Sequence, residues 1–390
     1  MPDMSGPSGG IGCSGWEEIF GQERAVSLLR AALARGDVPH ALLFTGPRGV
    51  GKFSTALLLA AALLCPSGGP DGCPSCLKVA EGVHPDLHLV EPEGMNITVG
   101  RIREIEGELS RKPAEAGCRV VIVDDADLMN RESANAFLKT LEEPEPGTFI
   151  VLVCESRESL LPTVVSRCHE VRFSALGRQD VVRYLTEREG LPGEEAERLA
   201  GRSGGIFGRA LLWARRPELT AHWRRGVEFA ASLRRLTLLE ALERAGECCR
   251  LLREVRAEGE DDAREERYRR ALEVRAADLV ARKREERKKR ETARLRRQAA
   301  RDLLDGMSSF YRDIMLLNLA GEEGRPVGDQ DLFNPEWREE LEREVLHLGT
   351  LQAMRCLRSV LRAEAALEAN IDEALLLDGL VLNLRKNMRT

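Results

Sequence analysis

A glycine-rich segment directly after an apolar run gives the clearest sign of chemistry in this sequence. Gly46-Pro47-Arg48-Gly49-Val50-Gly51-Lys52 fits the pattern G-x-x-x-x-G-K, between a predicted strand and a predicted helix. The glycines let backbone N–H groups turn towards phosphate oxygens, and the helix N-terminus adds a favourable dipole. The segment therefore predicts an ATP-binding loop in which Gly46, Gly49, Gly51 and Lys52 bind the nucleotide. The alternative is an ordinary glycine-rich turn before a helix.

The residue after the lysine departs from the usual pattern. A Ser or Thr at this position normally binds Mg²⁺ through its hydroxyl, and here the residue is Phe53. Ser54 offers the next hydroxyl and is retained as a candidate cofactor-binding residue, although one helical step rotates a side chain by about 100°. We expect that nucleotide binds while Mg²⁺-assisted hydrolysis is weak or absent.

Two acidic residues follow the apolar segment Val120-Val121-Ile122-Val123. Asp124 ends a predicted strand, where a carboxylate would lie beside Mg²⁺. Asp125 stands where many such ATPases have a glutamate that orients the attacking water. Its side chain is one methylene shorter, and misplacement by about 1 Å costs ~10²-fold in rate. The alternative is a solvated strand end without a catalytic role.

The elements that must position these residues alternate between short apolar runs and helical patterns. Two of the runs are apolar at every position, which is typical of strands covered on both faces in a parallel sheet. The alternation predicts an α/β domain with a doubly wound parallel sheet over residues 15–174. We expect strands at 41–46, 86–92, 119–125, 149–155 and 169–174, and helices at 23–35, 52–64, 99–110 and 132–142.

The remainder of the chain contains no convincing strand pattern. Residues 1–14 predict a disordered tail, and residues 175–217 predict a small lid of two helices closed by glycines. Residues 218–390 predict an all-α domain. We expect its helices at 230–245, 303–320, 336–348, 351–369 and 371–387, with a charged helical stretch before residue 303.

Several segments, taken together and in order, resemble the AAA+ subunits of bacterial clamp loaders. They are the stretch from Phe20 through the glycine-rich loop, SANAFLKTLEEP (133–144), LPTVVSRC (161–168), SGGIFGRAL (203–211) and SSFYRDIMLLNLAG (308–321). The resemblance implies a pentameric ring that uses ATP to open a sliding clamp and place it on primed DNA. Residues 218–390 would form its oligomerisation collar.

The resemblance also assigns roles to two arginines. Arg167, in Ser166-Arg167-Cys168, matches the arginine finger that stabilises a neighbour's transferring phosphoryl group. Arg209 matches the lid arginine that contacts the γ-phosphate.

Phe53 favours a delta-prime-type subunit, with gamma/tau-type motor and delta subunits as ring partners. An active gamma/tau-type motor subunit is the alternative. No separate set of metal-binding acids for nucleotidyl transfer is visible, so the resemblance implies no polymerase active site in this chain.

Three cysteines lie in a Gly/Pro-rich insert over residues 65–76. Members of the family usually carry four cysteines here and bind a structural zinc, whereas this chain has Cys65, Cys73 and Cys76. Because structural zinc sites close with four ligands, either His84 or His88 completes the site or the site has degenerated. His84 belongs to an HPD segment that the resemblance associates with four-cysteine members too, which argues against it as a ligand.

Composition excludes several other classes of protein. The longest apolar run, Ala56–Cys65, is too short for a membrane span, and the ten cysteines form no secreted disulfide pattern, so we expect a cytoplasmic protein. The net charge of −6 argues against a protein that coats DNA. Residues 281–297, however, carry a local charge of +7 within the charged arm 253–300. We interpret the arm as a solvated helix, with contact to DNA phosphates or a partner as the alternative.

Overall fold

The computed structural model describes residues 15–70, 73–92, 96–255, 274–368 and 372–389. Contacts within the chain divide it into two compact units, and each is described by itself. Unit 1 comprises residues 1–211 and 259–285, and unit 2 comprises residues 212–258 and 286–390. The predicted tail 1–14 and much of the charged arm lie outside the described residues. Among the described residues, no helix is both long and apolar enough to cross a membrane.

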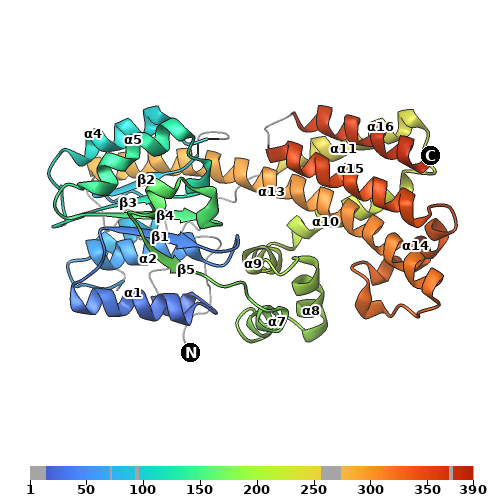
Figure 1. The fold of residues 1–390 in the computed structure, drawn as a ribbon, viewed down its shortest axis with the longest axis horizontal. Coiled ribbons are helices and arrows are strands. Elements are labelled where there is room, and N and C mark those ends of the chain that lie inside the picture. Colours follow the sequence, from blue (N-terminus) through green and yellow to red (C-terminus); the bar gives the residue numbers. More distant parts are fainter. Residues whose placement is uncertain (1–14, 71–72, 93–95, 256–273, 369–371, 390) are drawn as a thin grey trace. The chain divides into compact units, whose positions relative to one another are not determined.

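Unit 1 contains a five-stranded parallel sheet with the strand order β2-β3-β4-β1-β5, which confirms the predicted α/β fold (Figure 1). The five strands are β1 (Ala41–Thr45), β2 (Leu87–Val90), β3 (Arg119–Val123), β4 (Thr148–Cys154) and β5 (His169–Arg172). The helices around the sheet are α1 (Glu23–Arg35), α2 (Lys52–Leu64), α3 (Pro74–Ala80), α4 (Val99–Leu109), α5 (Arg131–Glu142) and α6 (Pro162–Val165).

Both faces of the sheet are buried, as the all-apolar strands predict. Successive residues of a strand point to opposite faces, so Leu42 and Phe44 pack with α1 and α2 while Ala41 and Leu43 join the core beneath α4 and α5 (Figure 1). Val120 and Val121 alternate in the same way. The central strands are therefore held from two sides, and the loops at their ends start from a rigid support.

The lid region differs from the prediction of two helices. It contains α7 (Arg178–Glu187), α8 (Gly193–Arg202) and α9 (Phe207–Arg215). The segment SGGIFGRAL turns at Gly204 and Gly205, both with positive φ, and then starts the third helix. Glycines follow the end of α8, as predicted, but a third helix, α9, comes after them.

Unit 2 is helical and includes α10 (Pro217–Ser232), α11 (Leu238–Glu254), α14 (Arg338–Val345), α15 (Thr350–Glu368) and α16 (Glu373–Arg389). The long helix α13 spans Val274–Glu323 and continues through residue 303, so the predicted break there is wrong. The predicted helix 230–245 is also wrong, because Thr237 begins a new helix with a capping box. Its hydroxyl accepts the N–H of Glu240, and the Glu240 carboxylate accepts the N–H of Thr237.

Two glycines bring α10 and α13 into direct backbone contact. A Cβ atom added at Gly226 would lie 1.9 Å from the carbonyl oxygen of Leu303, and one at Gly306 would lie 2.0 Å from that of Trp223. Any side chain at either position would force the helices apart. Gly306 therefore serves close packing and does not end the helix.

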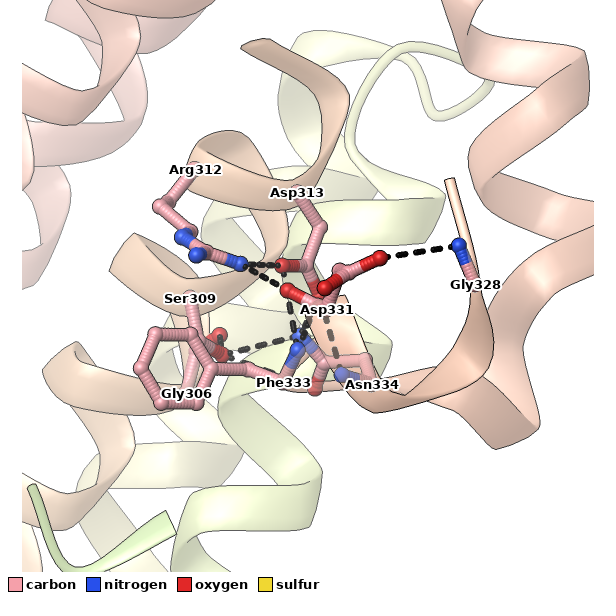
Figure 2. Close-up of polar contacts among 8 residues, drawn as sticks. All are labelled: Gly306, Ser309, Arg312, Asp313, Gly328, Asp331, Phe333 and Asn334. Atoms are coloured by element: carbon pink, nitrogen blue, oxygen red, sulfur yellow. Dashed lines mark hydrogen bonds and ion pairs between the residues drawn. The ribbon is translucent and has the colours of Figure 1, made fainter. Parts of the chain in front are cut away.

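A buried carboxylate fixes the segment that follows α13 (Figure 2). Asp313 is fully buried and accepts hydrogen bonds from the backbone N–H groups of Phe333 (3.1 Å) and Asn334 (2.9 Å) and from the Asn334 side-chain amide (2.8 Å). Arg312 donates to the same carboxylate at 2.8 Å, and its guanidinium lies 4.7 Å from the centre of the Phe333 ring. One side chain thus satisfies several buried donors on a segment without regular structure.

We predict that Asp313→Ala lowers the free energy of unfolding by about 3 kcal/mol, because it leaves buried N–H donors without acceptors. Chemical denaturation followed by circular dichroism measures the change. Asp329→Ala removes an exposed carboxylate of the same segment that pairs with Arg338, and it should change stability by less than about 1 kcal/mol. Equal effects of the two substitutions would contradict the role given to Asp313.

Candidate functional sites

The glycine-rich loop lies between β1 and α2, at the carboxyl edge of the sheet. Gly46, Gly49 and Gly51 have φ angles of 145°, 71° and 94°. A Cβ atom at Gly46 would lie 2.3 Å from the carbonyl oxygen of Phe173, so this position accepts only glycine. The loop therefore has the left-handed backbone conformations that a phosphate cradle requires.

Lys52 is buried within this loop. Its ammonium group donates hydrogen bonds to the carbonyl oxygens of Gly46 and Pro47, both at 2.6 Å. Burial lowers the pKa of Lys52, and Asp124, the strongest of the nearby carboxylates, opposes this shift. The structure thus brings together the predicted lysine and Asp124 across the carboxyl ends of two strands. Asp125 joins the same charge cluster and has a φ of 46°, which is unusual for a residue other than glycine.

A third acid of this cluster escaped the sequence prediction. Asp127 lies on the short 3-10 helix Ala126–Leu128, and its Oδ1 atom is buried without a hydrogen-bond partner among the described residues. Burial raises the pKa of Asp127, Asp125 raises it further, and Arg48 and Lys52 oppose the shift. The sequence signal was present in the spacing Asp124-Asp125-Ala126-Asp127, which places a further carboxylate three residues after the first.

The position that usually binds Mg²⁺ is occupied by an aromatic ring that packs against the core. Phe53 is half-buried and contacts the hydrophobic cluster between the sheet and α2. Thr55 is fully buried and donates its hydroxyl to the carbonyl oxygen of Gly51 at 2.8 Å. Ser54 is half-buried on the same turn. Position 53 thus offers no metal-binding hydroxyl, and its side chain packs against the core.

The end of β4 also meets the loop. Glu155 forms an ion pair with Arg48, and its carbonyl oxygen accepts the N–H of Gly46 at 3.0 Å. Cys154, the last residue of β4, is buried, and burial raises the pKa of its thiol to about 12. A protonated thiol can donate only weakly, here to the carbonyl oxygen of Ser156 at 3.3 Å.

The lid touches the loop through two glycine backbones. The N–H of Gly208 donates to the carbonyl oxygen of Gly49 at 2.8 Å, and a Cβ atom at Gly208 would lie 3.0 Å from two backbone atoms of Gly49. Phe207 stacks edge-on against Tyr184, which in turn packs edge-on against Phe20. These contacts place the next residue, Arg209, in the part of the lid that adjoins the phosphate loop.

Arg167 lies at the amino ends of the strands, whereas this loop lies at their carboxyl ends. It precedes β5, and a shallow hollow of about 450 Å³ beside it is lined by His40, Leu141, Glu142 and Ser166. His40 precedes β1, whereas the loop follows β1. The five residues of β1 span about 16 Å, which is longer than an arginine side chain. Arg167 therefore cannot reach the phosphate loop of its own chain.

The three cysteines of the insert gather at one point. Their sulfur atoms all lie within 4.8 Å of one another, with Cys73 Sγ 3.6 Å from both Cys65 Sγ and Cys76 Sγ. Four sulfurs bound to zinc at 2.3 Å would be about 3.8 Å apart, so the cysteines fit three corners of a tetrahedral site. Hydrogen bonds, first of all from Ser67, outweigh burial and lower the pKa of Cys65.

Neither candidate histidine joins this cluster. His84 is buried, and its Nδ1 atom accepts the N–H of Asp86 at 3.1 Å. The Nδ1 atom of His88 lies 2.6 Å from a carboxylate oxygen of Glu108. Among the described residues, no fourth His, Cys, Asp or Glu ligand accompanies the three sulfurs.

Taken together, the parallel sheet, the glycine-rich loop after β1 and the adjoining helical lid define an α/β fold of the P-loop type. Residues 21–177 match the family described as DNA polymerase III, delta subunit. The similarity of this part of the chain to delta-prime-type subunits, expected from the sequence, is thereby confirmed.

Individual relatives agree with this match. The chain is 37% identical over 181 residues to the DNA polymerase III subunit delta' of Bacillus subtilis, which covers 45% of this chain and 55% of the relative. It is 36% identical over 171 residues to the subunit delta' of Pseudomonas aeruginosa, covering 42% and 52%. The gamma/tau subunit of Mycobacterium tuberculosis is 34% identical over 187 residues, covering 46% and 32%. The chain spans about half the length of the delta' relatives that it matches.

Among solved structures, a DNA polymerase III gamma subunit-related protein of Thermotoga maritima is similar over 93% of this chain and 99% of its own. The identity is 22% and the TM-score is 0.40.

Proposed function

We propose that this chain is a delta-prime-type subunit of a bacterial clamp loader. In this role it would help ATP-driven loading of a sliding clamp onto primed DNA, in a ring with gamma/tau-type and delta subunits. The observation that carries the proposal is the match of residues 21–177 to the delta-subunit family together with the two delta' relatives. The roles of individual residues below are part of the same proposal.

Arg167 would act on the nucleotide of a neighbouring subunit. Its place at the amino edge of the sheet, a strand length from its own loop, supports action in trans. A planar guanidinium can stabilise the charge that spreads over the transferring phosphoryl oxygens, which is worth about 10³–10⁵ in rate. Arg209 would contact nucleotide from the lid, and its neighbour Gly208 already touches the loop.

Assembly would use unit 2, where two adjacent helices expose apolar side chains. Leu351, Met354 and Leu361 recur along one face of α15, and Leu375 and Leu382 are seven residues apart on α16. Each set lies opposite the buried face of its helix. Contiguous exposed apolar patches mark protein–protein interaction sites, which supports a contact through this face.

Nucleotide would bind the chain's own loop without effective hydrolysis. Gly46, Gly49, Gly51 and Lys52 would hold the phosphates of ATP, with Ser54 nearby. Asp124 would lie beside Mg²⁺ and Asp125 would face the attacking water. Phe53 removes the hydroxyl that normally completes Mg²⁺ coordination. Phe53 at this position favours a ring subunit without effective ATP hydrolysis over the alternative of an active motor subunit.

Zinc bound to Cys65, Cys73 and Cys76 would be structural. Cys65 follows α2, while Cys73 and Cys76 lie at the start of α3, so a bound ion would fasten two helices to each other. The spacing of the three sulfur atoms supports this part of the proposal.

The role of Arg167 is tested by reconstituting the chain with its gamma/tau-type and delta partners and the sliding clamp. We predict that Arg167→Ala lowers the rate of ATP hydrolysis at the adjoining site by about 10³ or more. The total DNA- and clamp-stimulated turnover should fall by that site's share. Arg172→Ala, which removes an exposed arginine at the other end of β5, should leave turnover unchanged. Unchanged turnover in Arg167→Ala, with normal assembly, would refute action in trans.

A second prediction concerns the chain's own nucleotide site. Phe53→Thr should raise the Mg²⁺-dependent affinity for ATP by about tenfold or more, because the hydroxyl restores a metal ligand. Equilibrium binding with and without Mg²⁺ measures the change. Phe53→Ala, which removes the ring without adding a ligand, is the control. If both variants bind ATP equally, Phe53 does not limit metal binding.

A third prediction concerns zinc content. Protein purified without chelator should contain close to one zinc ion per chain by elemental analysis, and Cys76→Ser should lose most of it. Cys118→Ser is the matched control, because this thiol donates to the carbonyl oxygen of Leu63 outside the cluster. A zinc content near zero in the wild-type protein would exclude the site.

A further inference from the structure

The guanidinium of Arg167 is held by partners within its own chain. Glu142 forms an ion pair with one terminal nitrogen, and the other donates to the carbonyl oxygen of Thr163 at 2.8 Å and to the Ser166 hydroxyl at 3.3 Å. One third of the arginine side-chain surface remains exposed. The group is thus oriented but still accessible from outside.

Glu142 is the last residue of α5. The last carbonyl groups of a helix lack partners within it, and together they carry a partial negative charge. A guanidinium beside this helix end is attracted by that charge as well as by the Glu142 carboxylate. The helix end within the LKTLEEP segment therefore binds the arginine side chain of the SRC segment.

The position of Glu142 is itself fixed by the sheet. His40 Nε2 lies 3.2 Å from the carbonyl oxygen of Leu141, and the His40 carbonyl accepts the N–H of Ile150 in β4 at 2.7 Å. The end of α5 is in this way tied to the start of β1 and to β4. A displacement of the helix end would move the Glu142 carboxylate and, with it, the guanidinium.

We propose that Glu142 is a positioning residue for Arg167, a role that rests on the proposed function in trans. An exposed ion pair adds little to stability, so its effect should appear in the orientation of the arginine. A long side chain with many rotamers is restricted to one direction before a neighbour's triphosphate arrives. The neighbour then meets a preoriented guanidinium, as efficient phosphoryl transfer requires.

The test uses the reconstituted complex and compares Glu142→Ala with the wild-type chain. We expect the turnover number at the adjoining site to fall by about tenfold or more, since misplacement by about 1 Å costs ~10²-fold. The KM for ATP and the assembly of the complex should not change. Glu142→Gln, which keeps the shape and a hydrogen-bond acceptor, should recover much of the loss. Glu143→Ala, an exposed acid one residue further, should behave like wild type.

The outcomes separate this inference from the proposed function. If Arg167→Ala lowers turnover and Glu142→Ala does not, Glu142 has no positioning role while action in trans stands. If Glu142→Ala raises turnover, the carboxylate restrains the finger, and the inference is wrong. If Arg167→Ala itself has no effect, the proposed function fails and this inference fails with it. In the double variant Glu142→Ala/Arg167→Ala, the loss should equal that of Arg167→Ala alone.

Discussion

The two ends of the parallel strands carry different chemical groups, and the proposed roles of these groups depend on the distance between the two ends. The carboxyl ends of the strands carry the phosphate loop, Lys52 and the aspartates, whereas the amino ends carry Arg167 and its partners. Both faces of the strands are buried, and the length of the strands sets the separation between the two ends. The groups that the proposed function assigns to phosphoryl transfer are thus kept apart within one chain.

At the carboxyl ends of the strands, the loop has the backbone conformations expected of a phosphate cradle, while Phe53 replaces the usual metal-binding hydroxyl. The three glycines have the required conformations, and Lys52 lies among the loop carbonyls. Phe53 contributes to the core, and Asp127 adds a buried carboxylate with a raised pKa. The lid contacts the loop directly through Gly208. In the proposed function, recognition of phosphate and catalysis of its transfer would depend on different residues.

The features that could be predicted from the sequence are those that short-range patterns determine. The five strands and the helices over 23–35 and 52–64 follow from apolar runs and from the loop motif, and the structure confirms them. The predicted start of a helix at residue 303 was wrong, because α13 runs unbroken from Val274 to Glu323 and crosses α10 closely at Gly306. Local sequence does not reveal a partner helix about 80 residues away.

The same limit applies to the candidate sites. The sequence could place Lys52 near Asp124, because the loop with Lys52 follows one strand of the predicted sheet and Asp124 ends another. The contacts of Glu142 with Arg167 and of Gly208 with Gly49 join segments whose pairing depends on tertiary packing, and no motif spacing encodes them. For the cysteines, the spacing identified the cluster, but only the structure showed that His84 and His88 are bound elsewhere.

The placement of the loop and of Arg167 at opposite ends of the strands constrains the symmetry of any assembly that uses the proposed contact. If Arg167 serves a neighbour's loop, then each contact joins unlike surfaces, and a twofold dimer, which matches a surface with itself, is ruled out. Heterologous contacts instead propagate in one direction and either close into a ring or continue as a filament. The polarity of a five-residue strand, β1, would thus give the assembly a head and a tail.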